Sequence, residues 1–223
     1  MVLGICASRS YPWIINTDMI RNIYHDLRGL YGSFLNEVHG LSFFWRLRNL
    51  RIYGKTNKVI IEKGTHLGSN VKITIYGTRH KLLVKEGGVF KTGSLWFEDR
   101  DCFIEIGNNT TIEGAALAVA ENGTSIKIGK DCMLSANIHI STTDSHSIVN
   151  SEGERINPSK SVVIGDHVWV GRSVTINKGV NIGGNSIIAG NSVVTKDVNN
   201  NSVAAGIPAR IVKEDVNWIR ERI

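Results

Sequence analysis

The sequence predicts an all-β solenoid, a left-handed parallel β-helix, because aliphatic residues recur every six positions over much of the chain. Six consecutive hexads obey one pattern between residues 164 and 198. The 23 glycines against 3 prolines also indicate a turn-dense β architecture. We expect an N-terminal helical segment over residues 1–56, the solenoid over 57–212 and a short C-terminal helix over 213–223.

Three positions of each hexad carry the pattern. The first is aliphatic: Ile164, Val170, Ile176, Ile182, Ile188 and Val194. The next is mostly small: Gly165, Gly171, Asn177, Gly183, Ala189 and Thr195. The fifth is small or β-branched: Val168, Val174, Val180, Ser186, Ser192 and Val198. Three hexads make one triangular coil, so the aliphatic position is expected inside the prism. The small position is expected at a tight corner, where Gly and Asn tolerate unusual dihedrals.

The same pattern occurs earlier in interrupted form, as four sets of three aliphatic or aromatic positions. The sets are Ile61, Leu67 and Ile73; Val84, Phe90 and Trp96; Ile106, Ile112 and Ala118; and Ile128, Leu134 and Ile140. Successive sets start further apart than three hexads, which predicts a few extra residues at a corner of each coil.

Residues 1–50 do not follow the hexad pattern. Thr17 and Asp18 resemble a helix N-cap, and a helical apolar stripe follows. The stripe consists of Ile20, Ile23, Leu27, Leu30, Phe34, Val38 and Leu41. We expect helices that cap the open end of the prism. The alternative is peripheral membrane contact, because the aromatic run 43–45 lies among Arg46, Arg48 and Arg51.

Composition narrows the classes of protein. Hydrophobic residues make up 42% and charged residues 21%, as in folded soluble proteins. The three cysteines form no metal-binding pair, and the net charge of +6 comes without the dense basic run of a nucleic-acid footprint. That charge suits cofactor phosphates, an acidic polysaccharide or an anionic membrane surface. With no signal-peptide pattern and no apolar run of roughly 20 residues, we expect a cytoplasmic protein.

A polar segment interrupts the repeat between Ile140 and Ser161. The interval from Ile128 to Ile164 has the length of two three-hexad coils, and residues 141–160 are expected to form a loop outside the prism. His146 lies in this loop, and an imidazole is the commonest general base near neutral pH. Asp144 would share a face with His146 in extended backbone and could set its tautomer. The alternative is a surface histidine without a role.

Trp169 occupies the sixth position of its hexad, which faces outward. A large indole outside a narrow prism either packs under a loop or another subunit, or stacks on a ligand. It follows His146 by just over one coil, so the two can be close if the loop folds back.

Three segments resemble the sugar and polysaccharide O-acetyltransferase branch of the hexapeptide-repeat acyltransferases, which includes capsule and sialic acid O-acetyltransferases. The segments read TTDSHSI, IGDHVWVGRSVTINKGV and AAGIPAR. The resemblance implies a homotrimer that transfers an acetyl group from acetyl-CoA, without a metal, to a hydroxyl of a bacterial capsular or O-antigen polysaccharide or its sugar precursor. It also implies His146 as general base, Trp169 at the acceptor and acetyl site, and a set of CoA contacts. These are Arg172, Gly190, Thr195, Lys196, Arg210 and Lys213.

The chain also departs from that family. Arg172 stands where a smaller residue is common, and the asparagine that lies near the acetyl group is not located. Arg172, Gly190 and Pro208 follow one another at intervals of three hexads, which predicts one column along the prism, over which a pantetheine arm could lie. Lys196, Arg210 and Lys213 would supply positive charge for the nucleotide phosphates.

Three rival functions remain at this point. An N-acetyltransferase of an amino sugar or nucleotide sugar would use the same scaffold and co-substrate. A zinc enzyme on the same fold would need three histidines brought together, with His139, His146 and His167 as candidates. A solenoid without catalysis would bind no CoA.

Overall fold

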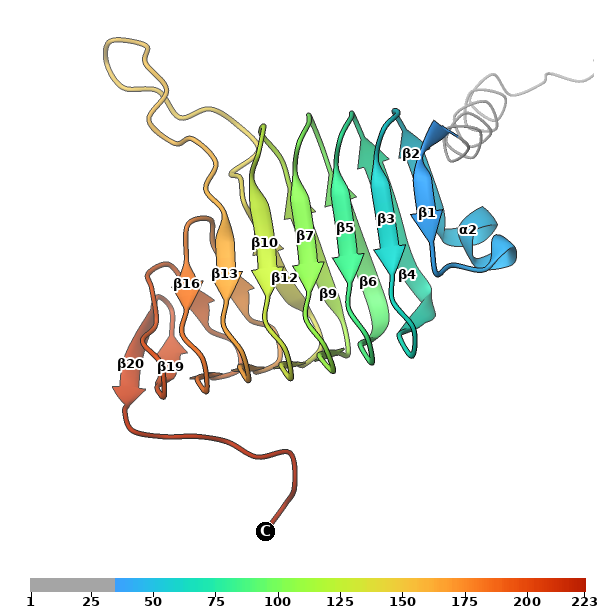
Figure 1. Cartoon of the computed structure of the whole chain (residues 1–223). Helices are drawn as coiled ribbons and strands as arrows, with labels where there is room; N and C mark the ends of the chain where they lie inside the picture. Colours follow the sequence, from blue (N-terminus) through green and yellow to red (C-terminus); the bar gives the residue numbers. More distant parts are fainter. Residues whose placement is uncertain (1–34) are drawn as a thin grey trace, which may run out of the picture.

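The computed structural model describes residues 35–223, which form a three-sided parallel β-solenoid (Figure 1). The coils stack along one axis from the N-terminal to the C-terminal end, and every paired strand but the last, β20, runs parallel to its neighbour. The expected architecture of stacked parallel coils is therefore confirmed.

One strand per coil forms each side of the prism. The first side is a seven-stranded sheet of β1 (Glu37–His39), β3 (Lys58–Ile61), β5 (Lys81–Val84), β7 (Phe103–Ile106), β10 (Ser125–Ile128), β13 (Val162–Ile164) and β16 (Asn181–Ile182). The second side contains β8 (Thr111–Ile112), β11 (Met133–Leu134), β14 (Trp169–Val170), β17 (Ile187–Ile188) and β19 (Val203–Gly206), which pairs with β20 (Ala209–Lys213). The third side contains β2 (Leu50–Tyr53), β9 (Ala115–Val119), β12 (Ile138–Ser141), β15 (Thr175–Ile176) and β18 (Val193–Val194). β4 (His66–Tyr76) and β6 (Val89–Phe97) cross from the second side to the third.

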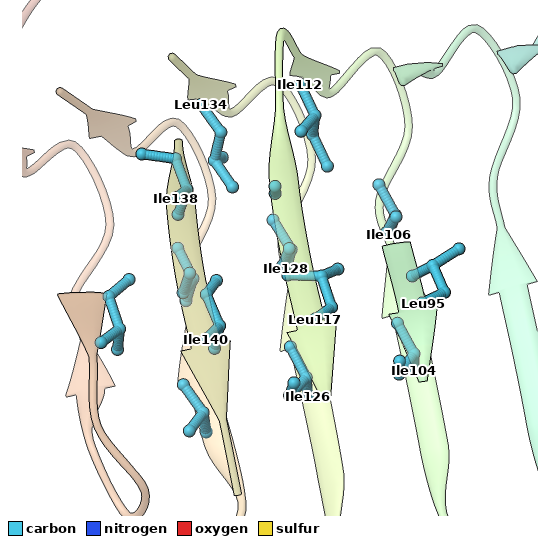
Figure 2. Close-up of a cluster of buried hydrophobic side chains, with 14 of the residues drawn as sticks. Leu95, Ile104, Ile106, Ile112, Leu117, Ile126, Ile128, Leu134, Ile138 and Ile140 are labelled. Atoms are coloured by element: carbon cyan, nitrogen blue, oxygen red, sulfur yellow. The ribbon is translucent and has the colours of Figure 1, made fainter. Parts of the chain in front are cut away.

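The prism interior is a continuous apolar core made mostly of aliphatic side chains (Figure 2). All six aliphatic positions and all six fifth positions of the C-terminal hexads are buried, as predicted. In the N-terminal half the hexad step fails on the third side. Leu95 and Leu117 point inward there, whereas Trp96 is 37% exposed and Ala118 faces outward. The predicted interior positions of Trp96 and Ala118 are therefore wrong by one residue.

Longer strands on the third side explain this shift. Val71, Ile73 and Ile75 of β4 are all buried, so the strand alternates inward and outward over several residues. The extra residues of the N-terminal coils thus lengthen a strand as well as its corner. In the C-terminal half the coils return to three hexads, as where Val163 pairs with Asn181, until the shorter last coil, in which Ile188 pairs with Ala204.

The small position of the hexad is required by space between coils rather than by its own dihedral. A Cβ on Gly171 would lie 2.5 Å from the backbone nitrogen of Gly190, and one on Gly183 would lie 2.1 Å from the Asn200 side chain. Positive φ angles occur two residues later, for example 58° at Ser173. The prediction that the small position adopts unusual dihedrals is therefore wrong.

The solenoid sheets begin before the expected boundary at residue 57. β1 pairs with β3 and β2 pairs with β4, so Val38 lies in a strand rather than at the end of the predicted helical stripe. A single short helix, α2 (Phe43–Asn49), lies between them in the described chain, with Phe43 and Phe44 exposed. The predicted N-cap at residues 17–18 and the stripe up to Phe34 lie outside the described residues. Within residues 35–223, no helix has the length and apolar character needed to cross a membrane.

The predicted C-terminal helix is wrong. β20 ends at Lys213, and residues 214–223 form no helix but return along the edge between the first and second sides as a strap. Trp218 of the strap is buried, and its indole Nε1–H donates to the carbonyl of His167 at 2.8 Å. Side-chain contacts with the prism replace the hydrogen bonds that a helix would form within itself.

Candidate functional site

A loop over residues 142–160 projects from the edge between the third and first sides (Figure 1). β10 pairs directly with β13, with Ile126 opposite Val162, so the interval from Ile128 to Ile164 is one coil carrying an insertion and not two coils. The backbone N–H of Lys160 donates to the carbonyl of Thr142 at 2.9 Å and closes the loop at its base. The predicted loop is therefore present, on a ladder that continues beneath it.

His146 is exposed on this loop, and its main chain is held on both sides. Its N–H donates to the Asp144 carbonyl at 2.8 Å, and its own carbonyl accepts from Asn157 Nδ2 at 2.9 Å. The Asp144 carboxylate accepts from Lys178 Nζ and from Asn157 Nδ2. Asp144 is thus linked to His146 through Asn157, and the Lys178 ammonium, together with Asn157, lowers the pKa of Asp144.

Asn157 organises the loop. Its side chain is buried, and Oδ1 accepts from the N–H of Ile148 at 2.7 Å while Nδ2 binds Asp144 and the His146 carbonyl. Sequence reasoning missed this residue. The only local signal was its place before Pro158, a dipeptide that marks a turn.

A second anchor joins the loop to the preceding coil. Arg155 donates to the carboxylate of Glu121, and the N–H of Ser159 donates to the same carboxylate at 3.1 Å. The Arg155 guanidinium, against an opposing effect of burial, lowers the pKa of Glu121 to about 2. Arg155 lies 34 residues from Glu121 along the chain, so no local pattern predicts the pair.

Trp169 is 38% exposed at the start of β14, next to the strap. Its ring centroid lies 6.2 Å from that of Trp218 at an interplanar angle of 51°. Trp218 in turn stacks on His167 at 4.1 Å, and His167 Nδ1 lies 2.7 Å from Asp131. Arg220 Nε donates to the other oxygen of Asp131 at 3.0 Å. Trp169 thus packs partly beside the strap and keeps part of its surface open.

A single chain does not bring His146 and Trp169 together. The loop leaves the prism between β12 and β13, before β13 begins. Trp169 begins β14, after β13 has ended. Figure 1 shows the loop extending from one edge and the strap from the opposite edge. The loop does not fold back over the second side.

The expected CoA positions are all exposed and fall into two groups. Arg172 and Gly190 share the corner between the second and third sides, where a Cβ on Gly190 would lie 3.2 Å from the Arg172 carbonyl oxygen. Pro208 does not continue this column, because the last coil is shorter than three hexads and pairs Ile188 with Ala204. The predicted column of three is therefore wrong at its third member.

The second group lies at the C-terminal end of the prism. Lys196 and Arg210 line one shallow cavity of about 270 Å³. Thr195 precedes Lys196 directly, and Lys213 pairs with Val203 at the end of the β19–β20 hairpin. Lys196 and Arg210 therefore bring positive charge to one cavity, which Asp197 also lines.

Comparisons with known proteins agree with this architecture. A family model described as the hexapeptide repeat of succinyl-transferase matches residues 161–196. A polysialic acid O-acetyltransferase of Neisseria meningitidis is 40% identical over 124 residues, which cover 55% of this chain and 56% of that protein. A crystal structure of a polysialic acid O-acetyltransferase is 34% identical with a TM-score of 0.74, covering 84% of this chain and 89% of that one. A second structure, of a polySia-specific acetyltransferase, is 34% identical with a TM-score of 0.70, covering 75% and 76%.

The chain belongs to the hexapeptide-repeat acyltransferases. This hexapeptide-repeat acyltransferase spans about half the length of the Neisseria relative that it matches. Within residues 35–223, no group of three or more His, Cys, Asp and Glu side chains could hold a metal ion. His139 lies on β12, His146 on the loop and His167 beside the strap, so the described chain does not assemble the ligand set of the zinc alternative.

The arrangement offers the hexapeptide-repeat acyltransferase a base, an aromatic surface and a cationic end. An exposed imidazole on an anchored loop can accept a proton from a bound hydroxyl. The part-exposed indole of Trp169 can cover an apolar portion of a ligand. Lys196 and Arg210 can bind phosphate oxygens.

Proposed function

We propose that this chain is an acetyl-CoA-dependent O-acetyltransferase that acts on a hydroxyl of a bacterial surface polysaccharide or its sugar precursor, built on coils wound in the left-handed sense. The observation that carries the proposal is His146 on an anchored loop of a chain 34% identical, over most of its length, to polysialic acid O-acetyltransferases. The similarity to these relatives supports a capsular polysaccharide as the class of acceptor.

The proposed reaction is direct transfer. The imidazole of His146 takes the proton of the acceptor hydroxyl, and the oxygen attacks the thioester carbonyl carbon. The C–S bond breaks, and the CoA thiolate leaves with the proton returned by His146. A backbone N–H near the coil corners stabilises the oxyanion. Ser135, Ser141 and Ser145 lack the strand–turn–helix setting of a nucleophile elbow, so no acyl-enzyme is required.

Supporting residues hold the base rather than react. Asp144, fixed by Lys178 and Asn157, is a positioning residue for the main chain around His146. Trp169 contacts the acceptor and the acetyl group. Arg172, Gly190, Thr195, Lys196, Arg210 and Lys213 bind CoA, with Lys196 and Arg210 on the nucleotide phosphates.

A homotrimer completes the site. His146 and Trp169 lie at opposite edges of one chain, so two neighbouring chains can combine them. The loop tip also carries exposed apolar side chains, Ile148, Val149 and Ile156, which a neighbouring prism would cover.

Acetyl-CoA turnover, followed by released thiol, tests the proposal. We expect turnover with hydroxyl-bearing polysaccharides, and a loss of roughly 10²–10⁴-fold in His146→Ala. Near-full activity in that variant would refute the assignment of the base. A preference for free-amine sugars would establish N-acetylation instead, and no CoA binding would refute the proposal as a whole.

A further inference from the structure

An aromatic cluster lies on the outer surface of the third side. Tyr53 and Tyr76 stack with ring centroids 4.6 Å apart at 10°, and Trp96 lies 5.1 Å from Tyr76 at 49°. Tyr76 is 38% exposed and Trp96 is 37% exposed. The acyl-transfer mechanism uses none of these side chains.

Small residues adjoin Trp96 on the side opposite Tyr76. In the next coil Ala118 is directly opposite Trp96, and in the coil after that Ser141 is opposite Ala118. Ser94 and Ala116 form the neighbouring outward row. Side chains of this size cannot cover an indole, so the Trp96 ring stands above its neighbours. We call the low surface formed by Ser94, Ala116, Ala118 and Ser141 the shelf.

The shelf leads to polar groups and to the reactive loop. A cavity of about 300 Å³ opens beside it, lined by Ala116, Asn137 and His139 among others. Ser141 ends β12, and the loop that carries His146 begins at the next residue. Trp96 and Ser141 lie two coils apart, which is two strand spacings or about 10 Å. A linear ligand lying across the shelf would therefore reach the loop.

We infer that this shelf binds further sugar units of the acceptor chain, with Trp96 as the stacking platform and Tyr76 behind it. The inference rests on the proposed function and assigns the site to units that are not themselves acetylated. The C–H bonds of a pyranose face carry partial positive charge and meet the negative face of an aromatic ring. Asn137 and His139 supply hydrogen-bond partners for hydroxyl groups.

A saccharide fits this surface better than a protein partner. Stable protein interfaces bury about 800 Å² on each partner around an apolar core. Here the aromatic area is limited to Tyr76 and Trp96, and the adjoining rows are Ala and Ser. One or two stacked rings beside small residues and polar groups match a narrow, flexible polymer.

Acceptor length tests the inference. Initial rates are measured with sialic acid dimers and trimers and with long polysialic acid, for wild type and Trp96→Ala. We expect the variant to lose roughly 2- to 12-fold in kcat/KM for the polymer, the range of one aromatic stacking contact. The kcat/KM for the short acceptors should not change in Trp96→Ala. Trp96→Phe should retain most of the wild-type kcat/KM for the polymer.

Phe103→Ala is the matched control. Phe103 faces outward on β7 of the first side, where Lys81 Nζ lies 5.3 Å from its ring centroid. The Phe103→Ala variant should leave kcat/KM unchanged for both the short and the long acceptors. Equal losses for short and long acceptors in Trp96→Ala would overturn the inference, as would a changed oligomeric mass, which would assign the shelf to contact between copies.

Direct polymer binding separates this inference from the proposed function. If wild type acetylates no sugar, affinity electrophoresis in gels containing polysialic acid still measures the shelf. Retardation of wild type that is weaker in Trp96→Ala would support the inference by itself. Equal mobility of the two proteins, or no retardation of wild type, would overturn it.

Discussion

At the scale of single residues, the position of His146 depends on contacts that begin far from it in the chain. The Asn157 side chain donates to the His146 carbonyl, and the Glu121 carboxylate accepts from Arg155 in the returning half of the loop. The candidate base is therefore placed by buried or ion-paired side chains on the loop and on the coil before it. Changes at these positions should alter catalysis more than folding.

Arg155→Ala tests the anchor. We expect kcat to fall roughly ten- to a hundredfold, because a small displacement of a catalytic group is costly. The free energy of unfolding should change by about 1 kcal/mol or less, since both partners are about one-third exposed. Steady-state kinetics and urea unfolding measure the two effects, with exposed Lys127→Ala as control. A loss of stability without a loss of kcat would contradict the positioning role.

The Glu121 carboxyl gives the same anchor a pH dependence. Its pKa is about 2 in the folded chain, below the ordinary 4.5. The anchor therefore stabilises the loop above pH 4.5, and the effect is lost as the pH falls from 4.5 towards 2. We expect the hydrogen-exchange rate of residues 142–160, relative to the intrinsic rate at each pH, to rise over that range in wild type. In Glu121→Gln this relative rate should already be raised at pH 7, and only the Asp144 carboxyl is left to titrate. An identical pH profile in the two proteins would refute this account.

At the scale of elements, the strap over residues 214–223 is a segment without secondary structure that is nonetheless well held. Trp218 stacks on His167, and Arg220 binds Asp131. These contacts place one indole beside Trp169. The strap therefore shapes the environment of a proposed site residue.

Trp218→Ala should release the strap. We expect a stability loss of up to about 3–5 kcal/mol, the range for burial of a large aromatic side chain, and greater solvent exposure of Trp169. Thermal unfolding reports the first effect. Fluorescence quenching by acrylamide reports the second, in chains whose remaining tryptophan is Trp169 and which carry either Trp218→Phe or Trp218→Ala. Exposed Ile219→Ala serves as control. Unchanged quenching of Trp169 would show that the strap does not cover it.

The sequence predicts the elements that depend on local period, and it misses those that depend on distant partners. The hexad step identified Ile128, Val168 and their equivalents, because each coil repeats the same environment. It failed at Trp96, where a longer strand follows a period of two. The strap is wrongly predicted as a helix because its partner His167 lies 51 residues away and leaves no local signal. The loop was predicted from its polarity, whereas its anchor at Glu121 had no local signal.

At the scale of the whole molecule, the proposed site needs more than one chain. Light scattering should give three times the mass of one chain. Ile148→Glu, at the exposed tip of the loop, should weaken this assembly because it places a charge in the covered apolar contact. Activity should fall with the loss of trimer and recover at high protein concentration. Lys63→Glu, on an exposed corner at the other end of the prism, should do neither. A fully active monomer would refute the shared site.

The continuous ladder beneath the loop has a consequence for divergence within the family. Ser141 is paired with Ala118 before the insertion, and Val162 is paired with Ile126 after it. The segment between Thr142 and Lys160 can become longer or shorter, or change its residues, without shifting the register of any coil. Mutations in this segment can therefore change which acceptor the chain uses, while the rest of the chain folds unchanged.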